Sequence, residues 1–207
     1  MSVDGLAVFT EAGDGDLRAD PDARRRLSSR LGIKEHWAVV DQVHGSAVLD
    51  VDEPGNHGPA DGLFTEAADL PLAVFTADCV GVVLMADDAI GVAHAGWRGA
   101  AAGVVTALRA RFESSGREVR RAVIGPHIRS CCFEVGPEVA ERFPDHVAET
   151  SWGTTSVDLA GVIRSQLDGV DVEDFTACTY HEGPWFSHRR DSNPRRLASL
   201  AVRRSRV

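Results

Sequence analysis

The chain has 207 residues, and its 31 acidic and 22 basic side chains give a formal net charge of -9. This negative balance disfavours a general nucleic-acid-binding protein, because the phosphate backbone would be repelled. Apolar stretches are broken by charge or glycine well before the ~20 residues that a membrane helix needs, and the N-terminus lacks a signal-peptide pattern. We therefore expect a cytoplasmic protein with no membrane segment, folded as one domain over residues 1–207, either monomeric or weakly dimeric.

The cysteines, at positions 79, 131, 132 and 178, are too few and too irregularly spaced for a disulfide framework in a chain of this length. Cys131 and Cys132 are adjacent, and neighbouring Cα atoms about 3.8 Å apart lie below the usual disulfide range. We interpret this adjacent pair as small buried apolar residues, not as a redox pair.

The first predicted element is a helix over residues 21–31, with Asp20 as its N-cap and Gly32 as its stop. Apolar, β-branched runs over residues 37–44 and 47–51 predict two strands, which places His44 at a strand end. Residues 53–62 are rich in glycine, proline and polar side chains and predict a loop, in which His57 is interpreted as solvated.

Two apolar runs on either side of Asp87 and Asp88 predict a hairpin with a two-residue loop. In that register Ala86 faces Ala89, so Cys79 falls opposite Gly96, on the same face of the sheet as His94. A direct or diagonal pair has Cβ atoms within ~5 to 8 Å, which two metal-binding side chains span. The hairpin therefore predicts that Cys79 and His94 meet.

An alanine-rich segment over residues 100–112 follows, with apolar side chains at helical spacing. The strand that carries His94 thus leads into the start of a helix, where free N–H groups lie beside Arg98. This combination suits phosphate or another anion. The alternative is that Arg98 pairs with a neighbouring carboxylate.

Further elements are a strand and turn at residues 122–126, a helix at 158–167 that Asp158 caps, and a strand at 175–180. Helices and strands are interspersed, but the strands come in pairs. This order favours the α+β class over a doubly wound parallel sheet.

One thiolate and two imidazoles, from Cys79, His94 and His44, form a three-ligand set that suits catalytic zinc and leaves a position for water or substrate. Separations of 35 and 15 residues are not a compact zinc motif, so a purely structural role for these residues also fits the spacing. A metal-free alternative uses Cys79 as nucleophile and His94 as its base. Asp78 then orients a histidine, acts as a general acid or base, or is simply solvated.

Six motifs carry a resemblance to a known family: Gln42-Val-His-Gly45, Thr76-Ala-Asp-Cys79, Ala93-His-Ala-Gly-Trp-Arg-Gly99, Ile124-Gly-Pro126, Phe133-Glu-Val-Gly136 and Phe186-Ser-His-Arg-Arg-Asp191. They resemble the YfiH family, variously named laccase-like polyphenol oxidase, purine nucleoside phosphorylase and peptidoglycan editing factor. The resemblance implies an α/β/β/α sandwich related to the catalytic domain of cytotoxic necrotizing factor. It also implies a zinc site at His44, Cys79 and His94.

The activity that the resemblance implies is phosphorolysis of adenosine, inosine, guanosine and methylthioadenosine, with adenosine deamination as a second activity. The partners are then a purine nucleoside and phosphate. Arg98 becomes a candidate phosphate ligand, and Gln42, Arg189 and Arg190 become candidates for contacts to substrate or phosphate, with structural ion pairs as the alternative for the last two.

Other functions attributed to the family stay open. One is a cytoplasmic amidase that edits peptidoglycan precursors, and a copper-dependent polyphenol oxidase ranks lower because it needs more ligating histidines than converge here. A non-catalytic binding protein ranks lower as well. The chain departs from the family in a short N-terminal region and in Pro194-Arg195-Arg196, which replaces Thr-Gly-Arg but keeps the final arginine. We therefore expect part of the substrate pocket to be missing or rebuilt.

Overall fold

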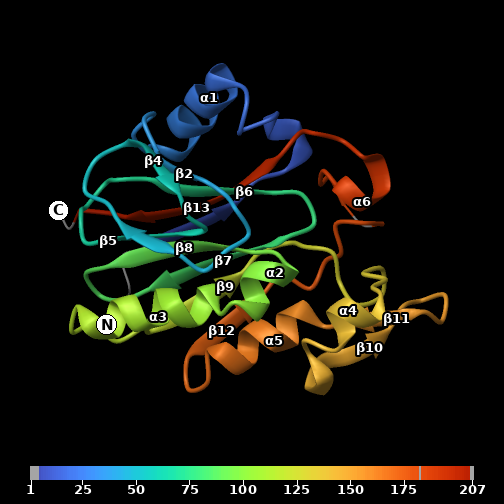
Figure 1. The fold of residues 1–207 in the computed structure, drawn as a ribbon. Helices are drawn as coiled ribbons and strands as arrows, with labels where there is room; N and C mark the ends of the chain where they lie inside the picture. The colour runs from blue at the N-terminus through green and yellow to red at the C-terminus, as the bar shows by residue number, and fades with distance from the viewer. Residues whose placement is uncertain (1–4, 182, 206–207) are drawn as a thin grey trace.

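Two β-sheets stacked face to face form the centre of the protein, and helices cover both outer faces (Figure 1). The structure is a computed structural model that describes residues 5–181 and 183–205. The layered α+β arrangement confirms the sandwich predicted from the sequence. Among the residues described, no helix has the length and apolar character needed to cross a membrane.

One sheet has five strands and the other has six. In spatial order the five-stranded sheet contains β1 (Gly5–Phe9), β13 (Leu197–Arg203), β6 (Leu72–Thr76), β2 (Ala38–Asp41) and β4 (Gly55–Pro59). The six-stranded sheet contains β12 (Asp171–Asp174), β9 (Arg121–Ile124), β7 (Val80–Met85), β8 (Ile90–Ala95), β5 (Gly62–Thr65) and β3 (Val48–Asp50). A separate short pair consists of β10 (Val147–Glu149) and β11 (Thr155–Val157).

The helices are mostly short. They are α1 (Pro21–Leu31), α2 (Trp97–Ala101), α3 (Val104–Ser114), α4 (Pro137–Ala140), α5 (Leu159–Gln166) and α6 (His188–Asp191), with 3-10 turns at Ala12–Asp14 and Pro144–His146. The predicted caps of the first helix are present, because the Asp20 carboxylate accepts hydrogen bonds from the N–H groups of Asp22 and Ala23. Helix α1 covers the five-stranded sheet, and α3 and α5 cover the six-stranded one (Figure 1).

The sequence of strand β7 is apolar without interruption because both faces of the strand are buried. Val82 and Leu84 point toward the helices, whereas Val83 and Met85 point toward the opposite sheet. Because successive side chains of a strand face opposite sides, a strand buried on both faces needs apolar residues at every position. The two sheets and the helical layer therefore share β7 and its neighbour β8 as their common core.

The β7–β8 hairpin confirms the predicted register. Val80 pairs with Ala95 and Met85 pairs with Ile90, with Asp87 and Asp88 in the connecting loop. This register carries the chain back past the start of β7 and directly into α2.

Three sequence predictions differ from the structure. The segment 53–62, predicted as a loop, contains the edge strand β4, which pairs in parallel with β2. Pairing at an edge uses backbone groups, so apolar side chains are not required there. The predicted helix over 100–112 is split into α2 and α3 at Gly103, whose φ of 79° is left-handed.

The third difference concerns the predicted strand at residues 175–180. The strand that pairs with β9 is instead β12, at Asp171–Asp174, and the only pairing beyond it among the described residues of that segment is an isolated bridge between Cys178 and His127. Val172 packs against the core while its strand neighbours carry acidic side chains. A single inward apolar residue is a weak strand pattern. The sequence prediction therefore placed the strand too late, at the aromatic residues that follow.

Candidate active site

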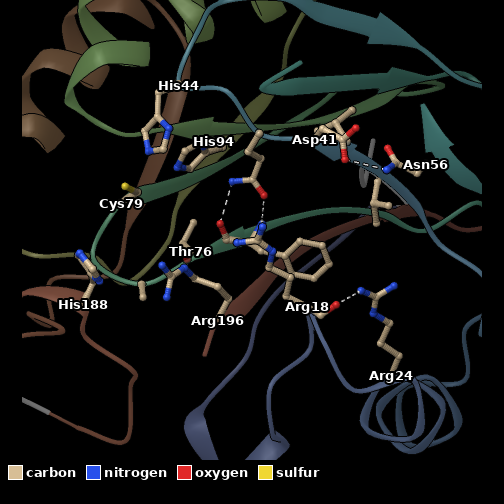
Figure 2. Close-up of a pocket in the computed structure, with 15 residues that line it drawn as sticks. Arg18, Arg24, Asp41, His44, Asn56, Thr76, Cys79, His94, His188 and Arg196 are labelled. Atoms are coloured by element: carbon tan, nitrogen blue, oxygen red, sulfur yellow. Dashed lines mark hydrogen bonds between the residues drawn. The ribbon is translucent and has the colours of Figure 1, made fainter. Parts of the chain in front are cut away.

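Three side chains from separate segments meet at one end of the stacked sheets. His44 follows β2, Cys79 directly precedes β7, and His94 lies on β8. Their ligand atoms all lie within 4.8 Å of one another, and the two imidazole rings pack edge to face with centroids 4.8 Å apart. Figure 2 shows the three side chains converging at one side of a pocket. The cluster contains every residue that the sequence suggested as a metal ligand.

Gly96 leaves the space in which this cluster forms. It lies opposite Cys79 in the extended hairpin register and caps α2. A Cβ atom at position 96 would lie 3.0 Å from Cys79 Sγ and 3.2 Å from His44 Cδ2, tighter than ordinary contacts. The absence of a side chain at this position therefore lets a histidine and a cysteine approach each other.

Asp61 is a central residue that the sequence analysis missed. Its carboxylate is completely buried and lies 2.8 Å from His94 Nδ1, measured from Oδ1. It also accepts hydrogen bonds from three successive backbone N–H groups, those of Val43, His44 and Gly45. The same carboxylate thus orients the His94 ring and holds the turn that presents His44, whose φ of 60° is unusual for a residue with a side chain.

The charges in the cluster reinforce one another. Burial alone raises the pKa of the Cys79 thiol, but hydrogen bonds and positive charge from His44 and His94 outweigh burial and lower that pKa to about 6. Burial alone lowers the pKa of His94, but hydrogen bonds to Asp61 and Cys79 and their negative charges raise it to about 9. Cys79 is therefore held as a thiolate at neutral pH, the form that binds metals and acts as a nucleophile.

Burial also acts on Asp61, and by itself it raises the pKa of that carboxyl. The hydrogen bonds from His94, Gly45 and His44, together with the charge on His94, outweigh burial and hold the pKa below its usual value. A charged carboxylate behind a histidine is the typical partner that fixes the tautomer of a metal-binding imidazole.

The cluster borders a pocket of about 420 Å³, a volume within the usual range of small-molecule sites. Besides the cluster, the pocket is lined by basic and polar side chains that include Arg18, Arg24, Asp41, Gln42, Asn56, His188 and Arg196. In Figure 2, Arg24 turns toward the Arg18 carbonyl, and Asp41 and Asn56 lie at the end of the pocket away from the cluster. Residues from the N-terminal region and from the turn at 194–196 therefore form part of the pocket wall.

The arginines of the pocket differ in their surroundings. Arg24 donates to the carbonyl oxygens of Leu17 and Arg18, and its guanidinium lies over the Phe75 ring. Arg196 Nη1 donates to the carbonyl oxygens of Asn193 and Arg195. Arg24 thus supports the loop that carries Arg18, and the Arg196 guanidinium is held in place at the pocket edge.

Asp78, a predicted catalytic residue, has a different environment from the cluster beside it. Its buried carboxylate accepts hydrogen bonds from the hydroxyls of Thr179 and Ser187 and from the backbone N–H of Arg189. It does not line the pocket. Asp78 therefore fastens the C-terminal segment next to Cys79, whereas Asp61 is the carboxylate that orients a histidine.

The predicted substrate contacts also lie in defined places. The Gln42 side chain lines the pocket but exchanges two hydrogen bonds with the backbone of Phe75. Arg98 is exposed on α2, outside the pocket lining, with its guanidinium 4.1 Å from the centre of the Trp97 ring. Arg189 donates to the carbonyl of Glu134, and Arg190 donates to backbone carbonyls and pairs with Asp191.

The residues of the cluster fit a metal ion. A thiolate and two imidazoles are ligands that zinc prefers, and three protein ligands with one side open to a pocket is the usual catalytic arrangement. Because Nδ1 of His94 is directed at Asp61, Nε2 is the nitrogen that remains for a ligand bond. The donor set, the orienting carboxylate and the space above Gly96 therefore all suit an ion bound between His44, Cys79 and His94.

The fold and site define a layered α/β/β/α protein with a pocket bordered by a histidine and cysteine cluster that fits a metal ion. The chain belongs to the family described as multi-copper polyphenol oxidoreductase laccase, whose model matches residues 6–204. This membership confirms the resemblance to the YfiH family, since solved structures named YfiH and YlmD share the fold.

Three relatives illustrate the similarity. Purine nucleoside phosphorylase ORF3 of Streptomyces griseus is 40% identical over 205 residues, which cover 89% of this chain and 83% of the relative. The crystal structure of the Bacillus licheniformis hypothetical protein YfiH superposes with a TM-score of 0.85 at 26% identity, covering 96% of this chain and 92% of that one. YlmD of Geobacillus stearothermophilus gives a TM-score of 0.83 at 29% identity, with coverages of 97% and 92%.

Proposed function

We propose that the protein is a zinc-dependent purine nucleoside phosphorylase acting on adenosine, inosine, guanosine and methylthioadenosine, with adenosine deamination as a second activity. The observation that carries the proposal is a single pocket with His44, Cys79 and His94 on one side and Arg18 and Arg196 on another. Relatives with the name purine nucleoside phosphorylase support the same reaction class. We expect it to act in the cytoplasm.

The arginines supply the phosphate site in this proposal. Two guanidinium groups from separate segments offer planar donors and positive charge to a phosphate oxyanion. Arg18 is exposed at the pocket wall, and Arg196 is held by backbone carbonyls, so both guanidinium groups face the cavity without a carboxylate partner among the described residues. We place phosphate beside them in preference to the position next to Arg98 that the sequence suggested, because Arg98 lies outside the pocket lining.

The far end of the pocket suits the polar edge of a purine. Asn56 donates a hydrogen bond to Asp41 Oδ1 at 2.8 Å, so the pair presents both acceptor and donor atoms to the cavity. A nucleoside bound with its base there has its ribose between the arginines and the cluster (Figure 2). Phosphate then attacks the anomeric carbon, the glycosidic C–N bond breaks, and the base leaves with the electron pair and takes up a proton.

The residues of the cluster have separate tasks in this scheme. His44, Cys79 and His94 hold zinc, which when bound supplies Lewis-acid chemistry that polarises a substrate oxygen. Asp61 keeps His94 in one orientation, and Gly96 leaves room for the Cys79 and His44 side chains. Since these side chains are fixed before substrate arrives, little reorganisation is needed during the reaction.

Incubation of the purified protein with adenosine, with and without inorganic phosphate, tests the proposal. We expect adenine and ribose 1-phosphate only when phosphate is present, a smaller yield of inosine, and loss of both products in Cys79→Ala. His57→Ala, which changes a histidine outside the pocket, is the control. Adenine release at the same rate with and without phosphate, or full activity of Cys79→Ala, would contradict the proposed chemistry.

Copper-dependent phenol oxidation, which the family description suggests, ranks lower. Within the described ranges, only one group of three potential ligands borders the pocket, whereas multicopper chemistry uses more. Oxidation of a phenol by protein that contains several copper ions per chain would reverse this order.

A further inference from the structure

A second group of metal-type side chains lies away from the pocket. Cys131, Cys132, Cys178 and His181 offer three sulfur atoms and one nitrogen, all within 4.8 Å of one another. Cys132 Sγ lies 2.9 Å from His181 Nδ1 and 3.4 Å from Cys131 Sγ. None of the four residues lines the pocket described above. The group is therefore a separate cluster.

Residues from two distant parts of the chain form this cluster. Cys131 and Cys132 lie in a turn after β9, where the chain is not extended and adjacent side chains point the same way. Cys178 and His181 follow β12, and Cys178 is held beside His127 by a backbone bridge. The parallel pairing of β9 and β12 brings the two loops together at the same edge of the sheet.

The chemistry of the group is that of a closed zinc site. Three cysteines and one histidine are a common structural ligand set, and Zn–S bonds of about 2.3 Å place the ligand atoms of a tetrahedron about 3.8 Å apart. The separations of 2.9 and 3.4 Å are shorter than that value, and all four ligand atoms lie within 4.8 Å of one another, so small side-chain rotations suffice. Cys132 and Cys178 are 2% and 1% exposed, and four protein ligands leave no open position for substrate.

We propose that Cys131, Cys132, Cys178 and His181 bind a structural zinc ion, distinct from the metal site in the pocket. The ion would join the loop after β9 to the start of the C-terminal segment. Thr179, next to Cys178, donates to Asp78, and the same carboxylate holds Ser187, which precedes the pocket residue His188. Zinc at this cluster therefore steadies the segment that completes one wall of the pocket.

Oxidation of the cysteines is the competing chemistry. A disulfide between Cys131 and Cys132 needs an S–S bond of about 2.05 Å and an eight-membered ring, whereas the sulfur atoms lie 3.4 Å apart. Its formation removes two protons and two electrons and needs an external oxidant. Zinc binding needs only the loss of thiol protons to solvent.

The test measures zinc per chain in the full-length protein after exposure to a competing chelator. We expect the double variant Cys131→Ser/His181→Ala to lose one zinc per chain relative to the wild type, and Cys178→Ser to lose the same ion. Cys79→Ala should keep this zinc, so the two metal sites are distinguished and failure at one says nothing about the other. His36→Ala, an exposed histidine outside both clusters, is the matched control.

A second measurement keeps the proposal testable where the buried Cys178 variant fails to fold. Protein loaded with Co²⁺ should show intense near-ultraviolet absorption from thiolate-to-cobalt charge transfer. This band should survive in Cys79→Ala and fall severalfold in Cys131→Ser/His181→Ala, with circular dichroism showing that both are folded. Equal zinc and cobalt signals in the wild type and the double variant would overturn the proposal. So would a metal-free native protein whose mass is lower by two hydrogens.

Discussion

The carboxylate of Asp61 and the imidazole of His94 form a buried pair with 2.8 Å between Oδ1 and Nδ1. The same carboxylate receives the backbone N–H groups of residues 43–45, so it fixes two of the three cluster residues at once. A single side chain thus couples the β8 strand to the turn after β2. The geometry of the cluster therefore depends on that carboxylate.

Replacing Asp61 by Asn tests this dependence. An amide has one acceptor oxygen, so in either orientation its NH₂ group faces N–H donors that the carboxylate now satisfies. We expect zinc affinity at the pocket to fall by about 10- to 100-fold, the range typical for loss of a partner behind a metal-binding histidine. Competition between the protein and a zinc chelator measures the change.

Asp41→Asn is the matched control for Asp61→Asn. Asp41 also lines the pocket, but its carboxylate bonds Asn56 and does not contact the cluster. The zinc affinity of Asp41→Asn should equal that of the wild type. If Asp61→Asn binds zinc as tightly as Asp41→Asn, the carboxylate is not needed to organise the ligands.

Gly96→Ala tests the space that the cluster requires. The backbone of Gly96 (φ -65°, ψ 166°) accommodates alanine, so the added methyl acts mainly through its contacts with Cys79 Sγ and His44 Cδ2. Overpacking of this kind costs about 1–3 kcal/mol where the neighbours cannot move away. We expect activity to fall about tenfold or more, and the melting temperature to fall by about 2–12 °C.

Gly13→Ala is the control, because a Cβ at that position meets nothing within 4 Å. Phosphorolysis rates and thermal melts of the two variants give the comparison. Equal activity of Gly96→Ala and Gly13→Ala would show that the cluster accommodates a methyl group at position 96.

Local patterns predicted the parts of the site that lie on one hairpin. Strand alternation and a two-residue loop were enough to place Cys79 opposite Gly96 and on the same face as His94. The role of Asp61 could not be predicted from the sequence, because it depends on β5 lying next to β8 and on a turn from a third segment. The Asp61-Gly62 pair at the start of a buried strand was the one local signal, and the polar residues before it obscured that signal.

The fold was predictable to a similar extent. Helix α1 has an N-cap, a proline and a terminal glycine in sequence, and the structure reproduces all three. The edge strand β4 and the acidic strand β12 depend on backbone pairing with distant strands, which side-chain patterns do not encode. The arginines of the pocket were missed for a related reason, since Arg18 and Arg196 come from opposite ends of the chain and meet only in the folded protein.

Asp78 offers a direct test of a positioning role against the catalytic role predicted from its place beside Cys79. Asp78→Ala leaves two hydroxyls and the Arg189 N–H without their acceptor, and we expect a loss of about 1–3 kcal/mol in the free energy of unfolding. Asp78→Asn keeps an acceptor and tolerates the positive φ, so it should recover most of the stability and the activity.

Urea unfolding and the pH profile of kcat distinguish the two roles. A positioning residue gives an Asn variant with a nearly normal rate and an unchanged pH profile. A general acid or base gives an Asn variant as inactive as Asp78→Ala, with one limb of the profile lost. The second pattern would restore the catalytic role suggested by the sequence.

The phosphate site is decided by comparing Arg196 with Arg98. Arg196 lines the pocket and is anchored by the carbonyls of Asn193 and Arg195, whereas Arg98 stacks on Trp97 outside the pocket. Because a charged hydrogen bond contributes about 1.5–3 kcal/mol, Arg196→Ala should raise the KM for phosphate by about tenfold or more. Arg98→Ala should change it by less than about twofold, since an exposed charge is screened by water and salt.

Steady-state kinetics with phosphate varied at saturating nucleoside provide the measurement, and Arg196→Lys separates charge from shape. Lysine keeps the charge but loses the planar pair of donors, so it should recover part of the affinity and not all of it. A rise in the phosphate KM for Arg98→Ala with none for Arg196→Ala would move the anion to the start of α2. That result would favour the position beside Arg98 that the sequence indicated, with phosphate approaching the cluster from its helical side.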